Sequence, residues 1–387
     1  MIGAFTFNTS HRIVFESGAA ANLAKHAADY IGTRPLLITD KGIVSCGLLQ
    51  PIVSALSDAG LAVSVFDGVT ADPHRSIIDA AMNVASSLQP TSIIGFGGGS
   101  SIDVAKLVAL LQGNGKNLDD AWGIGNATGP RLPLILIPTT AGTGSEVTPI
   151  SIITVEEDEK KGVVSPHLLP DLAILDPILT LGLPAQVTAA TGIDAMVHAI
   201  EAYASKSANN NPVSRMLAIE ALKLLGANIE TAVFKSDDEA ARGAMLLGSM
   251  LAGMAFANSP VAAVHALAYP IGGTFHVPHG LSNALVLPHV LKFNNVVAAE
   301  TYAQLAPNLF PDLGSVVDAK ERAGLLADRL AILTAKLGLQ TRLQDVGISE
   351  DDLPKMAQDA MKQTRLLVNN PRELTESDAL AIYSAAL

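Results

Sequence analysis

The sequence predicts an α/β N-terminal domain followed by an all-α C-terminal domain. The chain has 387 residues, which is longer than a single hydrophobic core usually supports, and 49% of them are hydrophobic. Short β-branched runs alternate with helical stretches over the first half of the chain, which indicates a parallel, doubly wound sheet. After about Leu183, helical runs rich in Ala, Leu and Met continue to Leu387 without a convincing strand. We therefore place the domains at residues 1–182 and 183–387.

The elements of the N-terminal domain follow from the apolar runs. Helical spacing of apolar residues predicts helices over 47–60 and 75–88, and Pro184 can start the first helix of the second domain. Because the carboxyl ends of parallel strands all lie at the same edge of a sheet, ligands are expected at that edge. Buried strands are predicted at residues 34–42, 62–68, 91–99, 132–140 and 172–177.

Composition excludes several kinds of partner. The formal charge of −12 argues against nucleic acid and anionic lipid, because both require a basic surface. The single cysteine, Cys46, and the absence of a signal-peptide pattern in residues 1–20 predict a cytoplasmic protein. Residues 245–264 are apolar enough to suggest a membrane span. However, Asn258-Ser259-Pro260 interrupts them, which favours a buried helix pair.

A glycine turn follows the strand in "TSIIGFGGGSSIDVAK" (91–106). Glycines let the backbone approach an anion, and Ser100 with Asp103 has the spacing of a capping box at a helix start. The arrangement is Rossmann-like without the standard order, and a glycine turn without a ligand is the alternative. Asp40, after an earlier strand, is placed to bond a ribose hydroxyl and reject a 2′-phosphate. The turn itself offers Gly97, Gly98, Gly99, Ser100 and Ser101.

A second polar loop, "PTTAGTGSEVT" (138–148), also follows a predicted strand. Alone it would be an ordinary turn, but two such loops at one sheet edge favour a nucleotide cleft. Its hydroxyl groups come from Thr139, Thr140, Thr143 and Ser145.

Four side chains suggest a metal site. Asp194 and His198 are four residues apart, so both project from one face of a predicted helix. His265 lies in a helical run, and His279 lies in a Pro-His-Gly turn. One carboxylate and three imidazoles suit Fe²⁺ or Zn²⁺. A hydrogen bond on the helix surface is the alternative for the Asp194–His198 pair.

Four motifs in order, "GGGSSIDVAK", "PTTAGTGSEVT", "DAMVHAIEAY" and "PHGLSNALVLPHV", and the ending "NNPRELTESD" carry a resemblance along nearly the whole chain. The sequence resembles the iron-containing (group III) alcohol dehydrogenases. The resemblance implies a dehydroquinate-synthase-like fold, a metal held by Asp194, His198, His265 and His279, and bound NAD(P). Asp40 falls where relatives carry the acid that favours NAD over NADP. Asp72 takes the place of an Asn that contacts the cofactor in some relatives. The further cofactor contacts that it implies are Gly97–Ser101, Thr139–Thr143, Lys160 and the segment from Leu179 to Leu183.

One position departs from the family pattern. Many members have a second histidine four residues after the one that corresponds to His265. This chain has Tyr269 at that position, in "HALAYP". The hydroxyl of Tyr269 can still pass a proton, or the ring can form a wall of the pocket. His276 could substitute as the relay, although a surface hydrogen bond is the expected role, and His289 is expected to be structural.

These observations predict an NAD-dependent, metal-dependent alcohol dehydrogenase that interconverts small primary alcohols and aldehydes. We expect His265, Tyr269 and His279 at the reacting groups, and a homodimer or higher homo-oligomer. The resemblance implies that Ile150 and Phe256 lie at the substrate pocket. Because residues 244–291 carry no charge, short apolar alcohols should be preferred to hydroxy acids. The alternatives are a maleylacetate-reductase-like or other 2-oxo/hydroxy-acid oxidoreductase, a metal-dependent sugar-phosphate cyclase and a non-catalytic nucleotide-binding protein.

Overall fold

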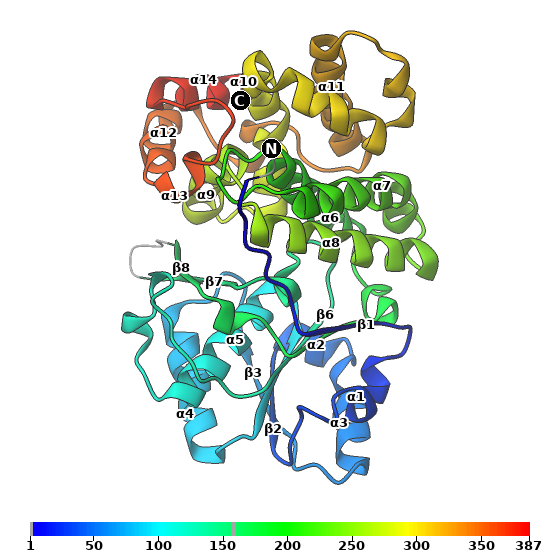
Figure 1. The fold of residues 1–387 in the computed structure, drawn as a ribbon, viewed down its shortest axis with the longest axis vertical. Helices are drawn as coiled ribbons and strands as arrows, with labels where there is room; N and C mark the ends of the chain where they lie inside the picture. Colours follow the sequence, from blue (N-terminus) through cyan, green and yellow to red (C-terminus); the bar gives the residue numbers. More distant parts are fainter. Residues whose placement is uncertain (1–2, 156–159) are drawn as a thin grey trace. The chain divides into compact units, whose positions relative to one another are not determined.

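The computed structural model describes residues 3–155 and 160–387, which form two compact units. The first unit comprises Asn8–Gly182, and the second joins Leu183–Leu387 to residues 3–7 (Figure 1). The backbone N–H of Thr6 donates to Oδ1 of Asn209 at 2.9 Å, and Nδ2 of Asn209 donates to the Thr6 carbonyl at 2.9 Å. The N-terminal tail is therefore part of the helical unit, which the sequence did not predict.

A six-stranded sheet forms the centre of the first unit. Its order is β1-β9-β6-β4-β2-β3, and all neighbouring strands are parallel, which confirms the predicted fold class. A smaller sheet has the order β5-β8-β7. The strands are β1 Arg12–Phe15, β2 Pro35–Asp40, β3 Ser64–Val69, β4 Ser92–Gly97, β5 Gly123–Ile124, β6 Leu134–Pro138, β7 Ile150–Thr154, β8 Lys160–Val164 and β9 Leu172–Leu175.

Helices cover both faces of the large sheet. Successive strand residues point to opposite faces, so each face presents apolar side chains that the helices bury. Leu36 and Ile38 of β2 pack in the core that α4 and α5 cover, whereas Leu37 packs in the core that α1 and α3 cover. The strands are apolar on both faces, as expected for a parallel sheet. The helices of this unit are α1 Leu23–His26, α2 Lys41–Ser45, α3 Leu49–Asp58, α4 Arg75–Leu88 and α5 Gly99–Asn114.

The second unit contains helices and no strand among its described residues. Helix α6 packs against α7, α8 and α10 and is buried over most of its length. Gly192 permits this packing, because a Cβ there would lie 2.7 Å from Cε of Met245 and 2.8 Å from Cδ1 of Ile229. The helices are α6 Ala185–Ala204, α7 Pro212–Phe234, α8 Glu239–Asn258, α9 Ala263–Phe275, α10 His279–Leu309, α11 Ala319–Lys336, α12 Leu353–Met361, α13 Thr364–Leu367 and α14 Glu376–Ala386.

The apolar stretch after Ala244 forms a helix pair. Helix α8 ends at Asn258 and α9 begins at Ala263, so the break falls at the predicted Asn-Ser-Pro sequence. In the described part of the chain, α8 alone is long and apolar enough to cross a membrane, and 61% of its most apolar stretch is buried inside the protein. A buried core helix passes the same test of length and composition, so α8 is weak evidence for a membrane span.

Candidate metal centre and nucleotide-binding loops

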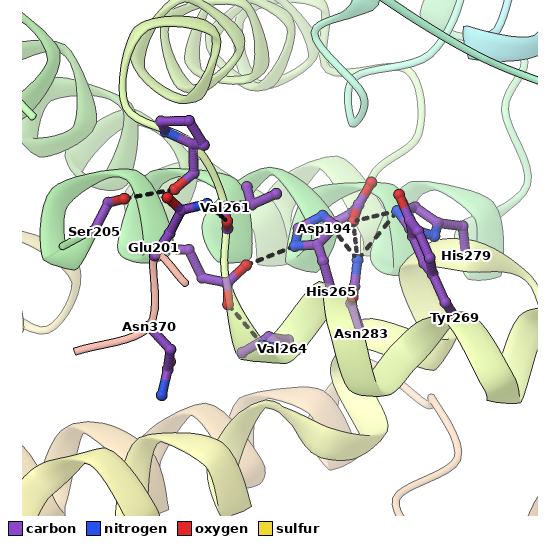
Figure 2. A network of polar contacts seen from close by, with 12 residues as sticks. Asp194, Glu201, Ser205, Val261, Val264, His265, Tyr269, His279, Asn283 and Asn370 are labelled. Atoms are coloured by element: carbon purple, nitrogen blue, oxygen red, sulfur yellow. Dashed lines mark hydrogen bonds and ion pairs between the residues drawn. The ribbon is translucent and has the colours of Figure 1, made fainter. Parts of the chain in front are cut away.

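Three helices of the second unit bring the four predicted metal ligands together. Figure 2 labels three of these ligands, Asp194, His265 and His279. Helix α6 supplies Asp194 and His198, α9 supplies His265, and α10 supplies His279. One ligand atom from each of these side chains lies within 4.8 Å of the other three. This separation suits a single cation surrounded by oxygen and nitrogen ligands.

Close packing of α10 on α6 places His279 beside Asp194. A Cβ on Gly280 would lie 2.3 Å from the carbonyl oxygen of Ala190, so only glycine lets the first turn of α10 approach α6 this closely. As a result, Nε2 of His279 lies 3.8 Å from Oδ1 of Asp194. The "PHG" sequence therefore contributes both a ligand and the contact that positions it.

The imidazoles form a row of rings with an open end. The His198 and His265 ring centroids are 4.8 Å apart, those of His265 and His279 are 5.4 Å apart, and Phe256 stacks on His198 at 4.4 Å. The side chain of His279 is 42% exposed, whereas that of Asp194 is 3% exposed. Catalytic metal sites keep such an open position for substrate, whereas structural sites are closed.

A buried carboxylate orients His265. Nδ1 of His265 lies 2.6 Å from Oε2 of Glu201, and the other Glu201 oxygen accepts from the Val264 N–H at 2.7 Å. An ionised carboxylate only accepts hydrogen bonds, so Nδ1 carries the imidazole proton and the Nε2 lone pair is left for a cation.

The Asn283 amide reaches into the space between the ligands. Its Nδ2 lies 2.6 Å from Oδ1 of Asp194, 3.4 Å from Nε2 of His265 and 3.3 Å from Nε2 of His279 (Figure 2). Its Oδ1 is buried without a hydrogen-bond partner. A polar atom left without a partner beside four inward-facing ligands fits a site built for a divalent cation.

The surroundings of Asp194 keep it ionised. Burial acts to raise the pKa of the Asp194 carboxyl, but the charges of His198, His279 and His265 and the Asn283 hydrogen bond together hold that pKa below its usual range. A carboxylate ligand must be deprotonated to bind a cation, so this environment suits coordination.

In the first unit, the two predicted polar loops lie side by side at the carboxyl ends of β4 and β6. Gly97 has φ 148°, in the region that favours glycine. A Cβ on Gly99 would lie 2.9 Å from Cγ2 of Thr143, and one on Gly98 would lie 3.7 Å from Thr140. The glycines thus allow the start of α5 to contact the 139–144 loop, leaving backbone N–H groups for an anion.

Asp40 lies beside the glycine turn. Its Oδ1 accepts from the Ile43 N–H at 3.0 Å as the N-cap of α2, and its Oδ2 accepts from Oγ of Ser101 at 3.3 Å. A Cβ on Gly97 would lie 3.2 Å from Oδ2 of Asp40. The acid therefore lies within contact distance of the turn expected to hold a pyrophosphate.

The predicted capping box at Ser100 and Asp103 is wrong. Helix α5 has Gly98 as its N-cap, with no side-chain hydrogen bond at that cap. Asp103 instead accepts from Oγ of Ser145 at 2.5 Å and from the Ile152 N–H at 2.8 Å. These partners come from a distant part of the chain, so local spacing could not reveal them.

The other predicted cofactor and pocket residues lie in different places. Asp72, at φ 48°, forms an ion pair with Lys160, so these two residues are brought together. Leu179 packs in the α1–α3 core of the first unit, whereas the carbonyl of Leu183, in the second unit, accepts from Arg242 at 3.2 Å. Ile150 begins β7 in the first unit, and Phe256 stacks on His198 in the second.

A buried ionic cluster that the sequence did not reveal fixes the polar loop. Nζ of Lys106 donates to Oγ of Ser145 at 2.9 Å, to Oγ1 of Thr148 at 3.0 Å and to the Ile150 carbonyl at 2.6 Å. Burial lowers the pKa of Lys106 to about 8 and raises that of Glu146 to about 7. The available signal was the presence of a lysine and a glutamate inside the two quoted motifs, because such residues are almost never fully buried unless they are paired.

Tyr269 borders the open side of the metal site. Its ring centroid lies 6.2 Å from that of His279. His276 ends α9 in the left-handed region at φ 55° and is exposed. His289 is half-buried on α10, and burial lowers its pKa.

Two residues at the metal site were not predicted. Glu201 lies one helical turn after His198, and Asn283 lies one turn after His279. Polar residues three or four positions from a ligand share its helix face, and the structure buries both Glu201 and Asn283. That spacing was the signal that could have found them.

Comparisons with known proteins agree with this geometry. The family model for iron-containing alcohol dehydrogenase matches residues 10–177, and the model for the C-terminal part of the Fe-containing alcohol dehydrogenase family matches residues 188–387. Long-chain-alcohol dehydrogenase 1 of Geobacillus thermodenitrificans is 41% identical over 91% of this chain and 89% of its own length.

Solved structures extend the likeness to the fold. The crystal structure of a 1,3-propanediol oxidoreductase has a TM-score of 0.93 and 35% identity, with 99% of this chain and all of that chain covered. The sulfoacetaldehyde reductase of Bifidobacterium kashiwanohense, solved in complex with NAD⁺, has a TM-score of 0.88 and 28% identity, covering 99% of this chain and 98% of that one. The chain belongs to the iron-containing alcohol dehydrogenases, NAD-using oxidoreductases that interconvert alcohols and aldehydes.

Proposed function

We propose that this enzyme oxidises small primary alcohols with NAD, or reduces the aldehydes, at a divalent iron or zinc site formed by Asp194, His198, His265 and His279. The observation that carries this proposal is the convergence of the four ligand atoms within 4.8 Å of one another. When bound, the cation supplies Lewis acidity at the substrate oxygen and NAD supplies the hydride acceptor.

The protein's own contribution is orientation. Glu201 fixes the ring of His265, and Gly280 lets His279 reach Asp194. Phe256, stacked on His198, supplies an apolar surface for the substrate carbon chain. Held reactants avoid much of the entropic barrier of a bimolecular reaction. Tyr269, beside His279, is a wall of the same site and takes the place of the second histidine that many relatives carry.

The nucleotide site is proposed at the two loops of the first unit. The turn from Gly97 to Ser101 and the loop from Thr139 to Thr143 would bind the pyrophosphate, and Asp40 would bond a ribose hydroxyl. A carboxylate in that position repels a 2′-phosphate, which supports NAD rather than NADP. Further cofactor contacts are proposed at Asp72, Lys160, Leu179 and Leu183, and a further substrate contact at Ile150.

We also propose a cytoplasmic homodimer or higher homo-oligomer. The single thiol, Cys46, is exposed and unpaired, which suits a reducing compartment. Several large apolar side chains of the helical unit are exposed, among them Met216 at 62% and Val317 at 92%, which supports contact with a second copy.

Family membership does not determine which chemical group lies at the end of the substrate away from the reacting carbon. The relatives named above act on long-chain alcohols, 1,3-propanediol and sulfoacetaldehyde, which differ in length and charge. The test measures oxidation of a panel of alcohols with NAD⁺ or NADP⁺, and reduction of the matching aldehydes with NADH or NADPH, by metal-reconstituted protein. We expect NAD-dependent oxidation of primary alcohols. Turnover confined to sugar phosphates, or none after reconstitution, would contradict the proposal.

A further inference from the structure

One arginine, distant in sequence, contacts the tyrosine that lies beside the exposed metal ligand. Arg365 lies on α13, which packs against α9. A terminal guanidinium N–H of Arg365 donates to Oη of Tyr269, with 3.2 Å between the nitrogen and the oxygen. Tyr269 in turn borders His279, at 6.2 Å between ring centroids, and His279 is the exposed member of the ligand set.

The backbone around Arg365 is fixed relative to α9. The buried side chain of Asn369 donates to the Arg365 carbonyl at 3.0 Å and to the Val261 carbonyl, just before α9, at 3.1 Å. The neighbouring Asn370 side chain, also buried, donates to Oδ1 of Asn294 at 2.8 Å. Arg365 is therefore an exposed side chain on a tethered segment, held at its tip by a tyrosine.

The positive charge of Arg365 is not neutralised by an ion pair with any carboxylate of residues 3–155 and 160–387. Residues 244–291, which supply His265, Tyr269 and His279, carry no charge of their own. The sequence-based expectation of an apolar pocket rested on that interval, and Arg365 lies outside it. The chain as a whole carries a formal charge of −12, so a local cation is needed to attract an anionic substrate.

We propose that Arg365, held by Tyr269, binds an anionic oxyacid group, a carboxylate or a sulfonate, at the far end of a short alcohol or aldehyde whose reacting oxygen lies at the four ligands. Guanidinium groups bind such anions through paired N–H donors. Arg365 donates to Tyr269, whose ring centroid lies 6.2 Å from that of His279, so a short substrate is the one that could reach both places. This inference rests on the proposed function and names its substrate class.

The experiment compares matched anionic and neutral alcohols on metal-loaded enzyme with NAD. One pair is 4-hydroxybutyrate with 1-butanol, which tests a carboxylate, and the other is 3-hydroxypropane-1-sulfonate with 1-propanol, which tests a sulfonate. For each pair the readout is the anionic-to-neutral ratio of kcat/KM in the wild type, in Arg365→Met and in Lys362→Met. Lys362→Met is the matched control, because it removes a positive charge from the same segment that is already paired with Asp359 at 2.7 Å.

We expect a wild-type ratio of about ten or more for at least one pair, as for a charge-assisted hydrogen bond, falling about tenfold or more in Arg365→Met. The ratio should be retained in Lys362→Met and should decrease as salt screens the charge. Calorimetric binding of butyrate and propane-1-sulfonate gives a second readout that needs no hydride transfer, and Arg365→Met should weaken it similarly.

Two outcomes would overturn the inference. One is a wild type that prefers the neutral alcohol of both pairs, and the other is a ratio and an anion affinity that Arg365→Met leaves unchanged. If the wild type oxidises 1-butanol without favouring either anion, the proposed function stands and the inference fails. If it oxidises no alcohol, the proposed function fails, and the calorimetric comparison alone decides whether Arg365 binds anions.

Discussion

Nδ1 of His265 and Oε2 of Glu201 lie 2.6 Å apart, and both side chains are at least 95% buried. The second oxygen of Glu201 accepts from the N–H of Val264, the residue before His265. One carboxylate thus fixes both the ring and the backbone of a metal ligand. It also sets the tautomer that leaves Nε2 free to coordinate.

Glu201→Gln should weaken metal binding about 10- to 100-fold, the usual effect of losing a carboxylate that supports a histidine ligand. Calorimetric titration of metal-free protein with Zn²⁺ or Co²⁺ measures this dissociation constant directly. NADH affinity, measured by fluorescence, serves as the control, because the glycine turn lies in the other unit. An unchanged metal affinity in the glutamine variant would show that Glu201 only packs.

Asp40→Gly should move the cofactor preference towards NADP by about 1–3 kcal/mol, because a like-charge contact with the 2′-phosphate is removed. Asp40 also caps α2, but glycine at an N-cap costs only about a few tenths of a kcal/mol, so the fold should survive. The measurement is kcat/KM with each nucleotide. If both proteins favour NAD to the same degree, the discriminating acid lies elsewhere.

Glu146 makes stability depend on pH. Burial raises its pKa to about 7 from 4.5, so the folded protein holds a proton that the unfolded chain has lost between those values. Stability should therefore fall as pH rises from about 4.5 to about 7. Glu146→Gln should remove that fall and be more stable than the wild type at pH 8. Urea unfolding from pH 5 to pH 8 tests this, and parallel curves for the two proteins would refute it.

Lys106 gives the opposite slope at higher pH. Its pKa is lowered to about 8 from 10.5, so the unfolded chain binds the extra proton between those values and stability should rise across that range. The two slopes can be separated, because the Glu146→Gln protein should keep only the second.

Tyr269→Phe distinguishes a proton relay from a pocket wall. A relay would lower kcat for 1-butanol by about 10²–10⁴-fold and change its pH profile, as general acid–base catalysis does. Because Oη of Tyr269 already accepts a hydrogen bond from Arg365, we expect the wall and a decrease of less than about tenfold. A decrease in the larger range would assign the relay to Tyr269.

The parts of the fold that are encoded locally were predictable. Strands β2, β4, β6 and β9 consist mostly of apolar residues, and the apolar residues of α4 have helical spacing. Strand β1 was not predicted, because its four residues are only partly buried and become a strand by pairing with β9. A contact so distant in sequence leaves no local pattern.

The same limit applies to the site. Asp194 and His198 share a helix face, so their spacing suggests a site, but the positions of Glu201 and Asn283 inside it depend on how three helices pack. The contact of Arg365 with Tyr269 depends on the tethering of the C-terminal segment by Asn369. Spacing in one helix could not show these contacts between helices.

Metal titration, followed by measurement of the recovered activity, tests whether Asp194, His198, His265 and His279 together hold one catalytic cation. Metal-free wild type should bind about one equivalent of Fe²⁺ or Zn²⁺ per chain and regain alcohol oxidation, as expected for a mononuclear site. His279→Ala should lose both, while NADH affinity survives. His276→Ala removes an exposed histidine from the short connection between α9 and α10, next to His279, and should behave as wild type. Near-normal activity of chelator-treated His279→Ala would contradict the account.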